Sequence, residues 1–301
     1  MERLITILGP TATGKTNVAT HLAQKINGEI ISADSRQVFQ HMDIGTGKDL
    51  NEYQIEDTFI PYHLIDIKKP GEEYSLFEFL KDYKKAFQLI KSNNKEAIMC
   101  GGTTLYLNAL LQSYSFVEIP DNYELPEQFL NKNLEELVQE LAKRQALHNT
   151  TDTSDKARAL KALREAIYIE ENPSQTMQLP KVRHLVFGIS LERDEIKKRI
   201  TQRLKERLQN GMIEEAEILL EMGLSFEDLK YYGLEYKYLA LFLEGKINRN
   251  DLFQKLNSAI HEFAKKQMTR YRKMEKEGIE IKWIDGRLPT DDKVQLILDN
   301  L

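Results

Sequence analysis

The sequence predicts an α/β fold in which helices flank a parallel sheet and a small helical domain is inserted. Short apolar runs alternate with longer segments of helical periodicity, which is typical of parallel strands joined by crossover helices. A glycine-rich turn joins the first apolar run to the first helical segment. Residues 119–180 interrupt this alternation because they are polar and carry only helical patterns. We therefore expect a core formed by residues 1–118 and 181–301, with the insertion at 119–180.

Four apolar runs in the first part of the chain predict buried strands. They are residues 4–8, 29–33, 63–67 and 97–100. The first is β-branched and ends at Gly9-Pro10, and a helical pattern follows it to about Lys25. Between the third and fourth runs, apolar residues recur at helical spacing from Leu76 to Ile90, which predicts an amphipathic helix.

The insertion and the second half of the chain are mostly helical by pattern. Helices are expected at residues 134–147, 156–169, 192–221, 235–244, 251–276 and 291–301. Strands are expected at residues 182–191 and 279–284. The late strands would extend the sheet begun by the first half of the chain, so the insertion separates two parts of one core.

Composition and charge restrict the kind of protein. With 41% apolar and 30% charged residues the chain reads as a soluble globular protein. No stretch approaches the roughly 18 apolar residues of a membrane span, and Met1–Gly9 is too short for a signal segment. The single cysteine, Cys100, fits a reducing cytoplasm. We expect a cytoplasmic protein without a membrane partner, and a monomer as the default in the absence of any sequence feature for assembly.

The formal charge of −5 argues mildly against a nucleic-acid partner. The charge is uneven, however, because residues 255–273 hold six basic side chains against one acid, Glu262. On charge alone, this run is either a local basic face for RNA or a solvated helix surface.

A glycine-rich loop follows the first predicted strand, and we call it the phosphate loop. It consists of Gly9, Pro10, Thr11, Ala12, Thr13, Gly14, Lys15 and Thr16. It fits G-x-x-x-x-G-K-[ST] between a strand and a helix, which is the pattern of a P-loop. Backbone N–H groups and the helix N-terminus attract an anion, Lys15 adds a positive charge, and the Thr16 hydroxyl is placed to ligate Mg²⁺. The motif predicts that a polyphosphate binds, but not which bond is broken.

Four further segments complete a recognisable pattern. They are residues 31–39 (ISADSRQVF), 42–48 (MDIGTGK), 63–67 (HLIDI) and 101–106 (GGTTLY). Together with the phosphate loop they resemble, in order and spacing, the bacterial tRNA dimethylallyltransferases, also called tRNA isopentenyltransferases. The resemblance resumes at residues 192–208 and 232–272. It implies a kinase-like P-loop core that binds dimethylallyl diphosphate in place of ATP.

The resemblance also implies a reaction and its residues. The exocyclic amine of the adenosine 3′ to the anticodon attacks the allylic carbon, and pyrophosphate leaves. Asp34 corresponds to the general base that takes a proton from this poor nucleophile. Arg203 corresponds to a diphosphate-binding arginine, and Thr103 to a threonine that contacts the reacting region. Lys15 and Mg²⁺ would stabilise the charge that gathers on the leaving group.

On the residues alone each of these three has a plainer alternative. Asp34 could cap the next segment or ligate magnesium through water. Arg203 could be a surface residue of a charged helix. Thr103 could only cap the helix that starts near Thr104. The resemblance favours the catalytic interpretation of all three.

The RNA partner is the tRNA anticodon stem-loop, whose target base must leave its stack to reach the donor. Residues 265–272 (KKQMTRYR) resemble the family's Lys-Arg-Gln-x-Thr-Trp-x-Arg segment, which faces the anticodon loop. The expected tRNA-binding residues are Asp34, Ser35, Arg36, Gln37, Arg158, Lys237, Lys265, Lys266, Gln267, Thr269, Arg270 and Arg272. The sequence departs from the family pattern at His261, where arginine is usual, at Arg270, where tryptophan is usual, and in the insertion.

An adenylate prenyltransferase acting on free AMP is a close alternative, and the segment at residues 265–272 favours RNA over it. Two functions of other classes also stay open at this stage. A nucleotide or small-molecule kinase would use the same loop for ATP, although the sequence shows no acceptor site for it. A tRNA-binding paralogue that has lost turnover would keep the basic segment, and the intact phosphate loop argues against it.

Overall fold

The computed structural model describes residues 2–112, 117, 119–120, 122–144, 153–173 and 177–301. The chain divides into two compact units, one formed by residues 1–112 and 181–301 and the other by residues 113–180. No helix in these described ranges is long and apolar enough to cross a membrane.

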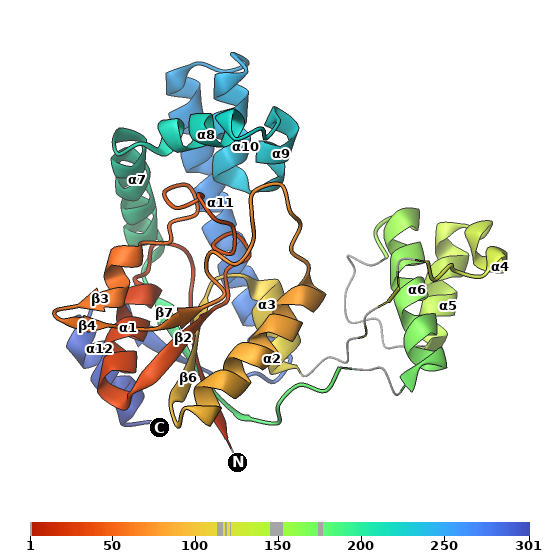
Figure 1. The fold of residues 1–301 in the computed structure, drawn as a ribbon, viewed down its shortest axis with the longest axis horizontal. Coiled ribbons are helices and arrows are strands. Elements are labelled where there is room, and N and C mark those ends of the chain that lie inside the picture. Colours follow the sequence, from red (N-terminus) through yellow and green to blue (C-terminus); the bar gives the residue numbers. More distant parts are fainter. Residues whose placement is uncertain (1, 113–116, 118, 121, 145–152, 174–176) are drawn as a thin grey trace. The chain divides into compact units, whose positions relative to one another are not determined.

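In the larger unit, six of the described strands form one sheet in which every neighbouring pair is parallel (Figure 1). The order is β5-β2-β6-β1-β7-β8. The strands are β1 (Arg3–Leu8), β2 (Gly28–Ser32), β5 (Tyr62–His63), β6 (Glu96–Gly101), β7 (Arg183–Ser190) and β8 (Ile281–Asp285). Because β1 is central, its carboxyl end places the phosphate loop at the middle of one sheet edge.

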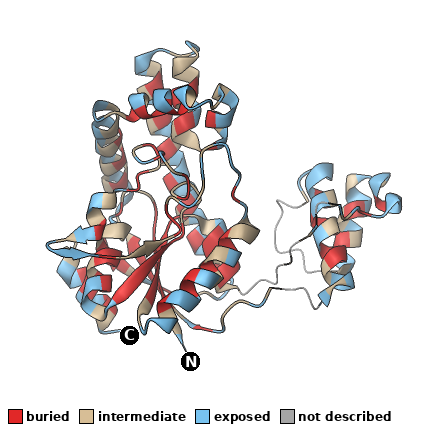
Figure 2. Ribbon diagram, in the orientation of Figure 1, coloured by how far each residue is buried: buried red, intermediate tan, exposed pale blue. Residues whose placement is uncertain are grey.

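Helices cover both faces of the sheet. Ile5 and Ile7 of β1 pack in one apolar cluster with residues of α1 (Lys15–Ile26) and α12 (Thr290–Leu298). Side chains alternate along a strand, so the buried Leu4 and Leu8 face the other side. The helices α2 (Leu76–Ser92) and α3 (Thr104–Leu111) pack against each other there, and Figure 2 shows the buried strands between the helical layers. The predicted α/β fold with a parallel sheet is confirmed.

A group of helices stands at the carboxyl edge of the sheet (Figure 1). It consists of α7 (Arg193–Gln209), α8 (Met212–Glu221), α9 (Phe226–Tyr231), α10 (Leu234–Leu243) and the first part of α11 (Arg249–Lys276). The single helix predicted over residues 192–221 is wrong. Gly211 has φ +97°, which favours glycine and ends the first helix before α8 begins.

The strand predicted at residues 63–67 is also mostly wrong, because β5 ends at His63. Leu64 and Asp66 have positive φ angles of 64° and 56°. Asp66 is turned toward the buried Lys48, whose Nζ donates to its carboxylate and, at 2.7 Å, to the Phe39 carbonyl. This cluster holds the loop after β2 in place. A short 3-10 helix, η1 (Leu50–Tyr53), and a hairpin of β3 (Gln54–Ile55) and β4 (Thr58–Phe59) follow that loop and were not predicted.

The smaller unit is helical in its described residues. It contains α4 (Glu127–Leu130), α5 (Leu134–Arg144) and α6 (Lys156–Glu171) around a core that includes Leu137, Leu141 and Leu163. The last residues of the helix predicted at 134–147 lie outside the described residues. Asp155 caps α6 by accepting a hydrogen bond from the Arg158 N–H at 2.9 Å.

Candidate active site

The phosphate loop runs from the end of β1 to the start of α1. Gly9 and Gly14 have φ angles of +150° and +80°, and a Cβ on Gly9 would collide with the Ile189 carbonyl oxygen. Thr13 is buried and its hydroxyl donates to the Pro10 carbonyl at 2.9 Å. The loop therefore has the fixed curvature that directs backbone N–H groups and the α1 N-terminus toward one point.

Lys15 carries the positive charge of this loop. Its Nζ donates to the Pro10 carbonyl at 2.8 Å, so the ammonium lies over the loop. Burial, and to a lesser extent the nearby Arg203 guanidinium, lowers the pKa of Lys15 to about 8, although the Asp34 and Glu52 carboxylates oppose the shift. An anion beside this ammonium would restore its proton affinity, so the lysine is adapted to a negatively charged ligand.

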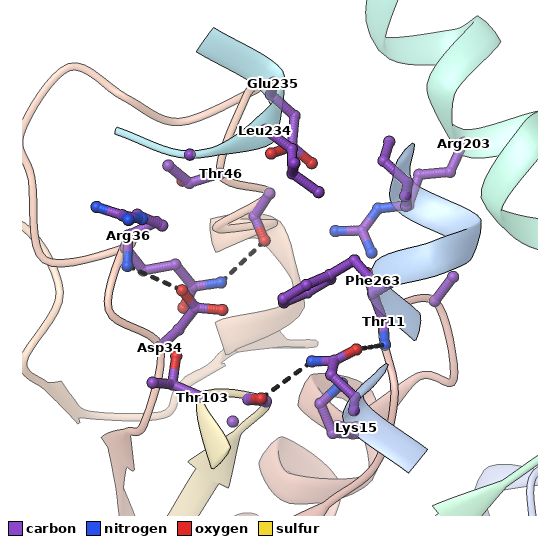
Figure 3. A pocket seen from close by; sticks show the side chains of 18 of the residues that line it. Thr11, Lys15, Asp34, Arg36, Thr46, Thr103, Arg203, Leu234, Glu235 and Phe263 are labelled. Atoms are coloured by element: carbon purple, nitrogen blue, oxygen red, sulfur yellow. Dashed lines mark hydrogen bonds between the residues drawn. The ribbon is translucent and has the colours of Figure 1, made fainter. Parts of the chain in front are cut away.

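α11, which lies more than 230 residues later in the sequence, holds the phosphate loop in place by hydrogen bonds. The side-chain amide of Gln267 accepts from the Thr11 N–H at 2.9 Å and donates to the Gly102 carbonyl at 3.0 Å (Figure 3). One turn further, the buried Tyr271 hydroxyl donates to the Gly9 carbonyl at 3.0 Å. The helix thus joins the phosphate loop to the loop after β6.

Asp34 follows β2 at the same edge of the sheet. One carboxylate oxygen accepts from the Arg36 N–H at 2.9 Å, and the side chain lines the cavity (Figure 3). The neighbouring Ser35 N–H donates to the Thr103 hydroxyl oxygen at 2.9 Å. Thr103 lies at the N-cap of α3 without making a side-chain capping bond, so the alternative that it only caps this helix is wrong. Thr103 instead ties the Asp34 segment to the end of β6.

Arg203 projects from α7 toward the phosphate loop (Figure 3). Its Nη2 lies 2.8 Å from Asp49 Oδ2, and Arg207 Nη2 lies 3.7 Å from Asp49 Oδ1. A Cβ on Gly47 would collide with both guanidinium groups, which explains why this loop position is a glycine. Burial, and then Arg203, lowers the pKa of Arg207 to about 10. The surface-residue alternative for Arg203 is therefore not supported, because its guanidinium is held in the cavity.

The loop that carries Gly47 is held by hydrogen bonds to one carboxylate, that of Glu215. Glu215 of α8 is 9% exposed and accepts from the N–H groups of Asp43, Ile44 and Gly45 at 2.7–2.8 Å. Its Oε1 also accepts from the Tyr236 hydroxyl at 2.6 Å. Four hydrogen bonds to one buried carboxylate fix the loop against the helix group.

Two further carboxyl groups line the cavity near the arginines. Burial, and then the Asp49 carboxylate, raises the pKa of Glu52 to about 7, although Arg203 and Lys15 oppose this shift. Burial also raises the pKa of Glu235. Carboxyl groups that share a cavity with several cations and have raised pKa values are typical of a functional site.

These residues surround one cavity of about 1110 Å³. That volume lies above the usual ~300–1,000 Å³ of a site for one small ligand. Lys15 lies at one part of its lining, Asp34 and Thr103 at another, and Arg203 above them (Figure 3). Thr16 also belongs to the lining. Within the described residues no group of three or more His, Cys, Asp or Glu side chains could hold a metal ion. Because the cations Lys15 and Arg203 share this lining with Asp34, the cavity can hold an anion near a carboxylate.

The residues expected to contact tRNA fall into three groups. Asp34, Ser35, Arg36, Gln37, Lys237, Lys266, Gln267 and Arg270 line the cavity. Lys265, Thr269 and Arg272 lie exposed on α11 outside its lining. Arg158 belongs to the smaller unit, where its guanidinium pairs with Asp155 at 3.4 Å and donates to the Ser154 hydroxyl at 3.1 Å.

Gln37 and Gln267 are occupied by contacts within the protein. The Gln37 amide donates to the Gly47 carbonyl at 3.0 Å and accepts from the Ser32 hydroxyl at 3.1 Å.

Arg36 lies over the ring of the exposed Tyr231 at 5.5 Å, which leaves an aromatic and a cation together at the cavity rim.

Sequence reasoning missed several residues of the site. They are Asp49, Glu52, Arg207, Glu215, Leu234, Glu235 and Phe263. Asp49 directly follows the recognised segment 42–48, and Arg207 lies one helical turn after Arg203. Their closeness in sequence to motif residues could therefore have identified them as site residues. Glu215 and Phe263 gave no such signal. In a helical pattern, an acid such as Glu215 is expected at the surface, and an aromatic residue such as Phe263 is expected in the core.

The fold and the site define a P-loop protein in which a polyphosphate site and a carboxylate share one cavity. A family model described as IPP transferase matches residues 37–274. The chain is 45% identical over 298 residues to tRNA dimethylallyltransferase 2 of Phocaeicola vulgatus, covering 99% of this chain and 97% of that protein. It is 50% identical over 284 residues to the same-named protein of Trichlorobacter lovleyi, covering 94% and 92%. The chain belongs to the IPP transferase family.

Solved structures agree with this assignment. The tRNA isopentenylpyrophosphate transferase of Bacillus halodurans superposes with a TM-score of 0.72 at 27% identity, over 100% of this chain and 95% of that one. A tRNA isopentenylpyrophosphate transferase of Staphylococcus epidermidis gives a TM-score of 0.70 at 28% identity, over 100% and 98%. The resemblance inferred from the motifs is confirmed.

Proposed function

We propose that this protein transfers a dimethylallyl group from dimethylallyl diphosphate to the exocyclic amine of the adenosine 3′ to the anticodon in tRNA. The observation that carries the proposal is the shared cavity, in which the phosphate loop and Arg203 face a carboxylate, Asp34. A kinase would need a site for a phosphoryl acceptor beside the phosphate loop. The relatives that match this chain are named as dimethylallyltransferases, not kinases. Family membership therefore favours prenyl transfer over the kinase alternative.

The reaction is a displacement at the allylic carbon. The adenine N6 forms a bond to C1 of the donor while the C1–O bond to the diphosphate breaks, and pyrophosphate takes the electron pair. The proton released from N6 passes to Asp34 and then to water. Asp34 suits this role because one of its oxygens is fixed by the Arg36 N–H at 2.9 Å. This bond sets the direction of the other oxygen into the cavity.

The leaving pyrophosphate gains negative charge as the bond breaks. Lys15, Arg203 and the N–H groups of the phosphate loop surround the place where this charge develops. Interactions that strengthen in the transition state lower the barrier. Asp49 keeps Arg203 in position by their 2.8 Å ion pair.

Mg²⁺ fits the oxygen donors present. The Thr16 hydroxyl and the Glu52 carboxylate line the cavity near Lys15, and hard oxygen ligands together with substrate phosphates are what Mg²⁺ prefers. When bound, the ion would neutralise charge on the diphosphate.

Binding of tRNA completes the proposal. The exposed basic residues of α11 would contact phosphates, and the cavity-lining residues Ser35, Arg36 and Lys237 would meet the flipped nucleotide. The insertion, residues 119–180, would contact the anticodon stem through Arg158 and its neighbours. We propose that the enzyme is a cytoplasmic monomer.

A labelled donor tests the proposal. Labelled dimethylallyl diphosphate and Mg²⁺ are incubated with unmodified tRNA that carries adenosine 3′ to the anticodon, beside AMP and ATP as acceptors. We expect label in tRNA alone. No transfer despite tight diphosphate binding would indicate a degenerate paralogue, and phosphoryl transfer from ATP would indicate a kinase.

A further inference from the structure

One face of α11 lines the cavity. Ile260, Phe263, Gln267 and Arg270 recur at helical spacing and all contribute to the lining. Gln267 is fixed by its hydrogen bonds to Thr11 and Gly102. Phe263, one turn before it, is therefore held near the phosphate loop by the same helix.

Phe263 is unusual for a large apolar residue. Its side chain is 44% exposed, whereas the other apolar residues of this helix face, such as Ile260, are buried. Figure 3 shows its ring projecting into the cavity, between Asp34 on one side and Lys15 and Thr11 on the other. An exposed aromatic inside a charged cavity loses hydrophobic stabilisation unless a ligand covers it.

A second apolar side chain faces the same space. Leu234, the first residue of α10, is half-buried and lines the cavity on the side of the helix group (Figure 3). Four charged side chains line the same cavity: Asp34, Arg36, Arg203 and Glu235 (Figure 3). Phe263 and Leu234 thus form an apolar spot between the base and the diphosphate cradle.

The donor has a matching polarity. Its diphosphate needs the phosphate loop, and its reacting carbon must lie between the leaving oxygen and the amine beside Asp34. The only apolar part, the five-carbon prenyl chain, then falls in the space between the two. The face of an aromatic ring also attracts positive charge, which develops on an allylic carbon as the C1–O bond breaks.

We propose that Phe263, with Leu234, binds the prenyl chain of the donor and limits its length. This inference rests on the proposed function. The ring excludes water from the reacting carbon and occupies the space that a second isoprene unit would need. Phe263 is thus a residue that determines which donor chain length is accepted.

The test compares donors of five and ten carbons, dimethylallyl and geranyl diphosphate, with one unmodified tRNA as acceptor. The variants are Phe263→Ala and Phe263→Leu. The matched control is Phe59→Ala, because Phe59 is 56% exposed on β4 and does not belong to the cavity lining. The measured quantity is the donor preference, that is, kcat/KM for dimethylallyl diphosphate divided by kcat/KM for geranyl diphosphate.

For wild type and Phe59→Ala we expect the same strong preference for the five-carbon donor. In Phe263→Ala the preference should fall by at least about tenfold, the usual range for a changed hydrophobic pocket. Phe263→Leu should lie between the two. An unchanged preference in Phe263→Ala, with or without a loss common to both donors, would overturn the inference.

Binding gives a readout that does not depend on turnover. Calorimetry measures the dissociation constants of dimethylallyl diphosphate and of inorganic pyrophosphate. Phe263→Ala should weaken the first several-fold and leave the second unchanged. Equal weakening of both would contradict a prenyl subsite. A wild-type protein that binds the donor but transfers nothing would refute the proposed function while leaving this comparison intact.

Discussion

Asp49 and Arg203 are joined by an ion pair of 2.8 Å that links the loop after β2 to α7. The other Asp49 oxygen lies 3.7 Å from Arg207, so one carboxylate orients two guanidinium groups over the phosphate loop. Both arginines line the cavity. The anion site is therefore assembled from segments more than 150 residues apart.

Asp49→Asn tests this arrangement. Without the charge, Arg203 samples more orientations and should bind the diphosphate less well. Because the pair is partly exposed, the loss is of the order of 1 kcal/mol or less, or about a three- to fivefold rise in the KM for dimethylallyl diphosphate with a smaller change in kcat. A fall in this KM would show that the negative charge of Asp49 opposes the donor more than its positioning helps.

Proton uptake should accompany binding at alkaline pH. The pKa of Lys15 is lowered to about 8, so at pH 9 the ammonium is largely deprotonated in the free protein. Because a bound diphosphate favours the charged form, pyrophosphate binding should take up a proton from solution at pH 9 and much less at pH 7. Calorimetry in buffers of different ionisation enthalpy measures this uptake.

The matched variant for this measurement is Lys15→Arg, whose guanidinium stays charged over the whole range. The variant should bind pyrophosphate more weakly and should lack the proton uptake that Lys15 causes at pH 9. Any protonation change of pyrophosphate itself occurs in both proteins, so the difference between them reports on Lys15. Equal proton uptake in the variant and the wild type would contradict the assignment.

Glu215 should be important for stability. Glu215→Gln replaces one acceptor oxygen with an amide that cannot accept from the N–H groups of the Asp43–Gly45 turn or from the Tyr236 hydroxyl. We expect a loss of about 2–3 kcal/mol in the free energy of unfolding, measured with urea. Tyr236→Phe removes only one of these bonds and should cost about 1 kcal/mol. Equal stability of Glu215→Gln and wild type would show that the loop does not depend on this carboxylate.

Much of the fold followed from local patterns. The strands at the sheet centre, the phosphate loop and the helix α2 are each specified by contiguous residues. The break at Gly211 depends on a single positive φ angle, and the early end of β5 depends on Lys48, which binds Asp66 from 18 residues away. Neither feature has a periodic signal.

The site was predictable where a motif carried it. Asp34, Lys15 and Arg203 do line one cavity. The supporting residues depend on contacts between distant segments, as Glu215 shows by binding a loop about 170 residues earlier. Phe263 fits the apolar periodicity of α11, and only the structure distinguishes a core position from a cavity wall.

The basic residues of α11 should supply affinity for tRNA. Changing Lys265 and Lys266 to alanine should weaken tRNA binding and reduce the slope of log K against log salt by about one to two, since each phosphate contact contributes about 0.7–0.9. The KM for the donor should change little. The double-lysine control is Lys84→Ala with Lys85→Ala on α2. An unchanged salt slope in the α11 variant would place the RNA surface elsewhere.

The most direct test of the account is single-turnover transfer by Asp34→Ala beside wild type, with saturating dimethylallyl diphosphate, Mg²⁺ and unmodified tRNA. If Asp34 is the general base, the rate should fall about 10²–10⁴-fold, while binding of pyrophosphate and the melting temperature stay near the wild-type values. A variant that transfers the prenyl group at the wild-type rate would contradict the central claim that this carboxylate and the phosphate loop act together in one cavity.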